Sequence, residues 1–312
     1  MTRRMVDLTK IKTIPLNIRK CKVSINDFAK PTKKASSFKA FYDALPNILA
    51  SRNIRALVDA VVDAHKKKRM IIFMMGAHVI KCGLSPLIID LIKRKVVKAV
   101  ALNGAGIIHD TEIAMIGRTS EDVGESIMNG SFGMAKETAY FINEAINSGF
   151  KKGLGIGEAL GGAIVKAKLP HKNLSILATG YERNAPITVH VAIGTDIIHQ
   201  HPSANGEAIG ESSLLDFKNF IYSVSKLENG VAINFGSAVI LPEVFLKAIT
   251  VARNLGYNSK VFVSANFDMI NQYRAYQNIL SRPTSSGGKA YNIIGHHEIM
   301  IPLFYRSIIE KI

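Results

Sequence analysis

The sequence predicts an α/β fold with an open, mostly parallel sheet and helices on both of its faces. Short apolar runs, typical of buried strands, alternate with longer runs whose apolar residues recur at helical spacing. Most of the strand-like runs end at a glycine or a small polar residue. Strands separated by helices form βαβ units with right-handed crossovers, and ligands bind at the carboxyl edge of such a sheet. We therefore expect a ligand site at that edge.

The predicted elements follow one another along the chain. We predict strands at 70–75, 96–102, 187–193, 231–235 and 260–265. We predict helices at 36–50, from 54 to the basic cluster at 66–69, and at 84–94, 214–227 and 244–255. Helical patterns dominate residues 118–170, which we interpret as a helical insertion or cap.

Length and composition favour one large domain preceded by an arm. The chain has 312 residues, and 47% of them are hydrophobic, enough for a sizeable core. We expect a basic N-terminal arm over 1–35 and a single domain over 36–312. The sequence has no apolar run of about 18 residues, so we expect no membrane span. It starts without a signal-peptide pattern and has only two cysteines, so we expect a cytoplasmic protein.

The chain is strongly basic. Its formal net charge is +16, and residues 1–40 hold eleven Lys and Arg against Asp7 and Asp27. Such a surface can mark a nucleic-acid footprint, but the interleaved aromatics and the zinc-finger or RNA-binding signatures are missing. We therefore interpret most of the charge as a solvated lysine-rich surface and expect no nucleic-acid partner. An anionic cofactor or a small acidic partner could also use it.

The glycine turn after the second predicted strand is the most informative local motif. Asn103, Gly104, Ala105 and Gly106 stand between that strand and a predicted helix. Glycine allows close backbone approach, and the free N–H groups of a helix start suit a pyrophosphate. The motif is shorter than a full GxGxxG, so a tight turn without a ligand is the alternative. A second glycine run at 153–162 follows two lysines instead of a strand, and we interpret it as close helix packing.

The block from Gly76 to Ala114 resembles the core of the deoxyhypusine synthase family. Ala77 and His78 stand at the family's Ser-Asn turn, and Asn103–Gly106 stands at its glycine turn. His109 and Asp110 fall at acidic positions of the family. Further on, AIGTDIIHQHP resembles the family's Ala-Leu-Thr-Asp segment, VFVSANF resembles a later strand, and SGGK resembles the Ser-Trp-Gly-Lys motif.

The resemblance implies a Rossmann-like fold, NAD as cofactor and a homotetramer with sites at subunit interfaces. It also implies a transferase reaction, in which NAD oxidises a polyamine such as spermidine and a lysine captures the aminobutyl group as an imine. Lys289 stands at that lysine's position, and Asp196 stands where the family contacts the cofactor ribose. The implied cofactor-binding residues are Ala77, His78, Asn103, Gly104, Ala105, Gly106, Asp110 and Asp196.

Departures from the family pattern concern the substrate. The chain has no tryptophan, Pro283 replaces an acidic residue before Lys289, and ILPEV replaces the family's His-His pair, so that Glu243 or nothing takes its place. A polyamine is a cation that needs carboxylates to hold it, and most of the expected ones are missing. We therefore predict an NAD-dependent enzyme acting on a small amine or amino-acid-like substrate that differs from the family's usual one.

Several histidines stand near the predicted strand ends. His109 and His297 are candidates for general acid–base catalysis, with Glu298 beside them, because imidazole titrates near neutrality. His199 and His201 would point to one face of an extended strand, as two metal ligands require. Two alternatives therefore stay open: a non-catalytic dinucleotide-binding or scaffold protein, and a metal-dependent hydrolase that uses the His-x-His pair.

Overall fold

The computed structural model describes residues 5–312. The chain folds into two compact units, Met1–Arg52 and Asn53–Ile312. The first unit thus takes in more of the chain than the arm predicted over 1–35. Within it, Lys30 N–H donates to the carbonyl of Ala44, and Asn47 N–H donates to that of Asp27. Its elements are η1 (Leu8–Lys10), η2 (Leu16–Ile18), η3 (Ile25–Asp27), α1 (Phe38–Ala44) and the start of α2 (Leu49–Lys66).

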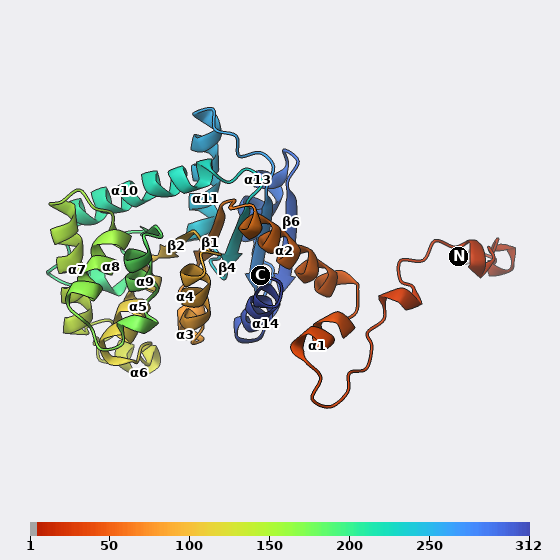
Figure 1. Cartoon of the computed structure of the whole chain (residues 1–312), viewed down its shortest axis with the longest axis horizontal. Coiled ribbons are helices and arrows are strands. Elements are labelled where there is room, and N and C mark those ends of the chain that lie inside the picture. Colours follow the sequence, from red (N-terminus) through yellow and green to blue (C-terminus); the bar gives the residue numbers. More distant parts are fainter. Residues whose placement is uncertain (1–4) are drawn as a thin grey trace. The chain divides into compact units, whose positions relative to one another are not determined.

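The second unit is built on one six-stranded sheet (Figure 1). Its strands are β1 (Ile71–Met75), β2 (Ala99–Asn103), β3 (Ile187–His190), β4 (Val231–Phe235), β5 (Val263–Asp268) and β6 (Lys289–Ile294). All neighbours pair in parallel in the order β3-β2-β1-β4-β5-β6. Along the chain, β2 pairs with one side of β1 and β3 pairs with β2, and β4 then pairs with the other side of β1. The point where the order reverses lies between β1 and β4.

Helices connect the strands. They are α3 (His78–Lys81), α4 (Ser85–Lys93), α5 (Gly104–Ile116), α6 (Val123–Met128), α7 (Lys136–Phe150), α8 (Ile156–Lys166), α9 (Ile176–Arg183), α10 (Gly206–Ser225), α11 (Ile240–Asn254), α12 (Tyr273–Ala275), α13 (Arg282–Thr284) and α14 (His297–Ile309). Shorter turns are η4 (Lys172–Leu174), η5 (Ile197–Gln200) and the π-helical η6 (Tyr276–Ser281). In the described part of the chain, none of these helices has the length and apolar character that crossing a bilayer requires.

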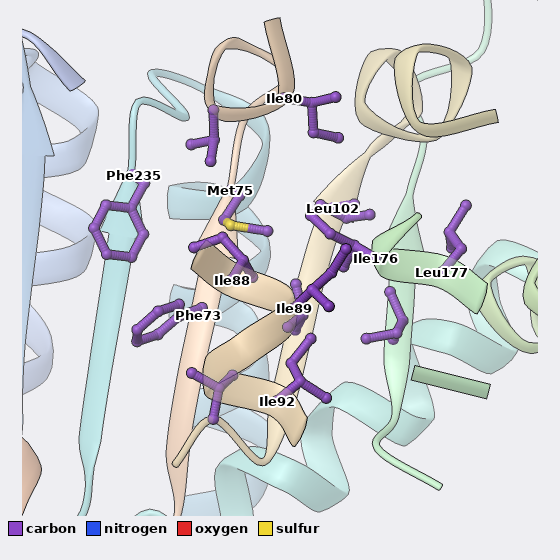
Figure 2. Close-up of a cluster of buried hydrophobic side chains, with 14 of the residues drawn as sticks. Phe73, Met75, Ile80, Ile88, Ile89, Ile92, Leu102, Ile176, Leu177 and Phe235 are labelled. Atoms are coloured by element: carbon purple, nitrogen blue, oxygen red, sulfur yellow. The ribbon is translucent and has the colours of Figure 1, made fainter. Parts of the chain in front are cut away.

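Each face of the sheet is covered by helices, as predicted. On one face, Phe73 of β1 and Phe235 of β4 lie beside Ile88, Ile89 and Ile92 of α4 (Figure 2). On the other face, alternate residues of the same strands pack against α10 and α11, which contribute Phe220 and Phe245 among others. A strand buried on both faces is apolar throughout, which explains the continuous run Ile71–Met75. Burying each such side chain stabilises the fold by roughly 1.5–3 kcal/mol.

The predicted strands all exist, with shifted ends. The strand predicted at 187–193 ends at His190, and the one predicted at 260–265 runs over Val263–Asp268. The sixth strand, β6, was not predicted. Residues 118–170, between β2 and β3, hold the helices α6, α7 and α8. The glycine run in α8 serves close packing, because a Cβ on Gly157 would lie 1.8 Å from the carbonyl oxygen of Ile187.

Candidate functional site

A pocket opens at the carboxyl edge of the sheet, where the strand order reverses. It has a volume of about 220 Å³ and lies over the ends of β1, β4, β5 and β6. The side chains and backbone that line it are those of His78, Gly236, Asp268, Met269, Ile270, Gln272, His296 and His297. Each follows or ends a strand, so the parallel register of the sheet brings together residues that are far apart in the sequence.

Two glycines allow the backbones to approach closely at this point. Gly76 follows β1, and a Cβ there would lie 3.0 Å from the carbonyl oxygen of Gly236. Gly236 follows β4 with φ +67°, a left-handed conformation that glycine adopts without strain. A Cβ on Gly236 would lie 2.4 Å from Cε1 of His297. Glycine at position 236 therefore leaves the space that the imidazole of His297 occupies.

His297 and Asp268 carry the polar chemistry of the pocket. Nε2 of His297 lies 3.2 Å from the carbonyl oxygen of Phe267 and donates to it, which leaves Nδ1 as an acceptor. Burial lowers the pKa of His297. The hydrogen bond to the Phe267 carbonyl and the charges of Asp268 and Glu298 oppose this shift, and His78 adds to it, so the pKa stays below its usual value and the neutral ring predominates at pH 7. Nδ1 of His297 and Oδ2 of Asp268 are both buried without a hydrogen-bond partner among the described residues. Two polar atoms are thus available to a ligand.

Glu298 lies in the first turn of α14, next to the pocket. Its carboxylate is 3.9 Å from the thiol of Cys82 and 3.9 Å from Nδ1 of His296. Burial raises the pKa of the Cys82 thiol, and the negative charge of Glu298 raises it further. Ala77 and His78 lie where β1 leads into α3. The ring centroids of His78 and His297 are 5.7 Å apart. The structure thus brings four predicted residues, Ala77, His78, His297 and Glu298, to one place.

A second group of predicted residues lies at the ends of β2 and β3. Asn103 caps α5, and its side-chain oxygen accepts the N–H of Gly106 at 3.0 Å. The strand, glycine turn and helix therefore follow as the sequence indicates. The carboxylate of Asp196 lies against this helix start, since a Cβ on Gly104 would be 1.8 Å from its Oδ2. Burial raises the pKa of Asp196 to about 6, and its Oδ2 has no partner in the described part of the chain.

Asp110 and His109 point elsewhere. Asp110 is fully buried, and its carboxylate accepts the N–H groups of Ile176 and Leu177 at 2.8 and 3.2 Å, so that it holds the start of α9. It is therefore placed to support the fold and not to contact a cofactor. His109 lies on α5 with Nδ1 2.6 Å from the hydroxyl of Thr119, and burial lowers its pKa. Neither side chain lines the pocket.

Lys289, the predicted catalytic lysine, does not line this pocket. It is the first residue of β6 and pairs with Val263, the first residue of β5. Its exposed side chain therefore lies at the amino edge of the sheet, a full strand length from His297 at the carboxyl edge. The SGGK segment leads directly into a strand, and this strand was missing from the sequence prediction.

The His-x-His pair does not have the geometry predicted for it. Residues 197–200 form the turn η5 instead of an extended strand. Nδ1 of His199 accepts the N–H of Gly194 at 3.1 Å, whereas Nε2 of His201 lies 2.8 Å from the carbonyl oxygen of Gly133. Within residues 5–312, no group of three or more His, Cys, Asp and Glu side chains could hold a metal ion. The observation that favoured a metal-dependent hydrolase is thereby removed.

The sequence prediction of the site omitted Gly236, His296 and the segment from Met269 to Gln272. The glycine after the fourth strand was visible as a strand-end signal. His296 could be assigned only once β6 was known, because it follows the end of that strand. Asp268 lies just beyond the strand predicted at 260–265, and it too lines the pocket.

Comparisons with known proteins come from structure alone. No protein-family model and no curated protein sequence matches the chain. A conserved LOR/SDH candidate protein from Methanococcus maripaludis S2 has a TM-score of 0.53 at 16% identity, over 90% of this chain and 75% of that one. A deoxyhypusine synthase candidate from Entamoeba histolytica has a TM-score of 0.52 at 12% identity, over 90% and 96% of the two chains.

A third similar structure is AgrE in its ternary complex with ornithine and NAD+. Its TM-score is 0.53 at 13% identity, over 84% of this chain and 34% of AgrE, so the chain spans about a third of AgrE's length. The sheet order defines an α/β protein of the Rossmann-like architecture. More narrowly, the chain has a divergent deoxyhypusine synthase-like fold, which confirms the fold class predicted from the sequence.

Proposed function

We propose that the chain binds NAD at the carboxyl edge of its sheet and acts on a small amine or amino-acid-like substrate. One observation carries this proposal: the pocket over His78, Gly236 and His297 lies at the point where the strand order reverses. In open sheets of this strand order, dinucleotides bind in the crevice at that point.

The residues at this edge fit such a cofactor. Gly76 and Gly236 leave space that a Cβ would fill, and two buried polar atoms lack partners among residues 5–312. A volume of about 220 Å³ is below the roughly 300–1,000 Å³ of whole-ligand pockets, so it suits one ring-sized part of the dinucleotide. The remainder would extend along the edge to β2, where the start of α5 suits a phosphate and Asp196 suits a ribose hydroxyl.

The pocket residues suit proton transfer next to a bound cofactor. When bound, NAD+ would supply an acceptor for a hydride from the substrate carbon. Neutral His297 would accept a proton at Nδ1, since its other nitrogen is held by the carbonyl of Phe267. The carboxylate of Asp268 would attract the positive charge of an amine substrate. That AgrE has been seen with ornithine and NAD+ supports this class of substrate.

Aminoalkyl transfer to an acceptor amine, and a homotetramer, are narrower proposals that rest on the family resemblance. Apolar side chains around the pocket support association with a second copy, because Met269 and Ile270 are about half exposed at its mouth. Light scattering of the purified protein measures the assembly directly. A monomer at micromolar concentration would contradict this part.

Titration with NADH tests the proposed function. The chain contains no tryptophan, so the nicotinamide fluorescence is read against a simple protein background. We expect one NADH per chain and competition by NAD+. In His297→Gln the amide can still donate to the Phe267 carbonyl, so binding should persist while amine-dependent NADH formation falls. The surface variant His171→Gln serves as the matched control.

The outcomes separate the remaining alternatives. Binding with no turnover on any amine or amino acid would favour the non-catalytic dinucleotide-binding protein. Absence of NADH binding at millimolar concentration would contradict the proposal itself.

A further inference from the structure

A second pocket lies at the opposite, amino edge of the sheet. It has a volume of about 620 Å³ and is lined by His65, Lys66, Lys68, Arg94, Lys95, Lys98 and Ile312. Helix α2 ends at Lys66 just before β1, and α4 ends at Lys93 just before β2. The ends of two neighbouring helices and the segments that lead into two central strands thus bring five cations together. This surface shares no residue with the pocket at the carboxyl edge.

The positive charge of this pocket is largely uncompensated. Arg94 pairs with Asp90 at 2.6 Å. The other four cations, Lys66, Lys68, Lys95 and Lys98, have no carboxylate within 4.0 Å in the part of the chain that the structure describes. The two helix ends contribute about half a negative charge each. Five cations less Asp90, the terminal carboxylate of Ile312 and the two helix ends leave roughly two positive charges.

The local geometry holds these cations close together. The ammonium of Lys98 donates to the carbonyl of Lys68, and burial together with the neighbouring Lys68 lowers the pKa of Lys98. Lys68 and Lys95 adopt φ of +57° and +59°, a conformation in which glycine is usual after a helix. Both positions thus carry a lysine where a glycine would fit more easily. A bound anion would relieve the repulsion among these side chains.

We propose that this pocket binds a small anion with two or three linked phosphate groups, such as the phosphate chain of a nucleotide. Its volume lies in the range of small-ligand pockets, and its net positive charge suits a di- or triphosphate. Lysine ammonium groups bind phosphate as point charges. The lining contains no Phe, Tyr or Trp on which the bases of a nucleic acid could stack. These features favour a compact polyphosphate over a nucleic-acid strand.

Calorimetric titration of the full chain with inorganic tripolyphosphate tests the proposal. We expect saturable binding of one anion per chain, and inorganic phosphate should bind about tenfold more weakly because it carries fewer charges. The exposed pair Lys66→Gln/Lys95→Gln should weaken tripolyphosphate at least about tenfold. The control pair Lys166→Gln/Lys168→Gln removes the same charge at the end of α8, and Lys168 also has φ of +52°. This control should change the affinity less than about twofold.

Three results would overturn the proposal. Equal loss of affinity in both variant pairs would mean that the anion responds to net charge alone. Displacement of tripolyphosphate by saturating NADH would mean that there is no separate site. An oligonucleotide that binds more tightly than tripolyphosphate through Lys66 and Lys95 would assign the surface to nucleic acid. Circular dichroism of both pairs checks that the fold is retained.

Discussion

Replacing Gly236 by alanine perturbs the proposed dinucleotide site through one added carbon atom. Residue 236 has φ +67°, and a left-handed conformation costs a residue with a Cβ about 1–2 kcal/mol. The Cβ would also lie 2.4 Å from Cε1 of His297, so the ring must move and give up its hydrogen bond to Phe267, which is worth about 0.5–1.5 kcal/mol. We expect Gly236→Ala to lower the free energy of unfolding by about 2–3 kcal/mol.

The chain offers a matched control for the backbone effect. Gly256 has φ +85°, and a Cβ there would meet no atom within 4 Å. Gly256→Ala should therefore cost only the strain of about 1–2 kcal/mol and leave NADH binding unchanged. Gly236→Ala should weaken NADH binding at least about tenfold, because the displaced ring enters the pocket. Urea unfolding and NADH titration measure both quantities. Equal NADH affinities for the two variants would refute the reasoning.

Other predictions concern the fold and the excluded lysine. The carboxylate of Asp216 accepts the N–H groups of Gly157 and Val189 at 3.0 and 2.9 Å. Asp216→Ala leaves both groups buried without an acceptor, so it should lower the free energy of unfolding, measured in urea, by about 3–5 kcal/mol. A loss below about 1 kcal/mol would contradict this. Burial lowers the pKa of His190 to about 3, so the folded ring stays neutral while the unfolded one gains a proton below about 6.5. The natural chain therefore loses stability as the pH falls from about 6.5 toward 3. His190→Gln lacks this loss, so its free energy of unfolding relative to that of the natural chain should rise by about 2 kcal/mol between pH 7.5 and pH 5. A difference between the two chains that does not change with pH would contradict this. Lys289→Ala should change the NADH affinity less than about twofold relative to the natural chain, since the Lys289 side chain lies at the amino edge. A large loss of affinity in the same titration would show that this lysine takes part in the site.

Periodicity found most of the sheet because buried parallel strands are continuous apolar runs. The runs at 71–75 and 231–235 are buried throughout, and their limits were predicted within one residue. Strand β6 was not predicted because it lies at the edge of the sheet and is not a continuous buried apolar run. Its residues Lys289, Ala290 and Ile294 are exposed. Without this strand, the sequence could not indicate that Lys289 lies at the amino edge of the sheet.

Local sequence could not reveal which strand ends meet. His78 and His297 are 219 positions apart in the chain, and only the order β1-β4-β5-β6 brings their rings together. The sequence located Asn103–Gly106 correctly as a strand–helix turn, because Asn103 caps the helix through local contacts. It could not show that Asp110 is used by α9, since that partner lies 66 residues away. Predictions from local contacts were therefore the more dependable ones.

A crystal structure grown with NAD+ tests the central claim most directly. We predict density for the dinucleotide over His78, Gly236 and His297, extending along the carboxyl edge toward Asn103. A carboxyl edge without any dinucleotide at saturating NAD+ would contradict the account.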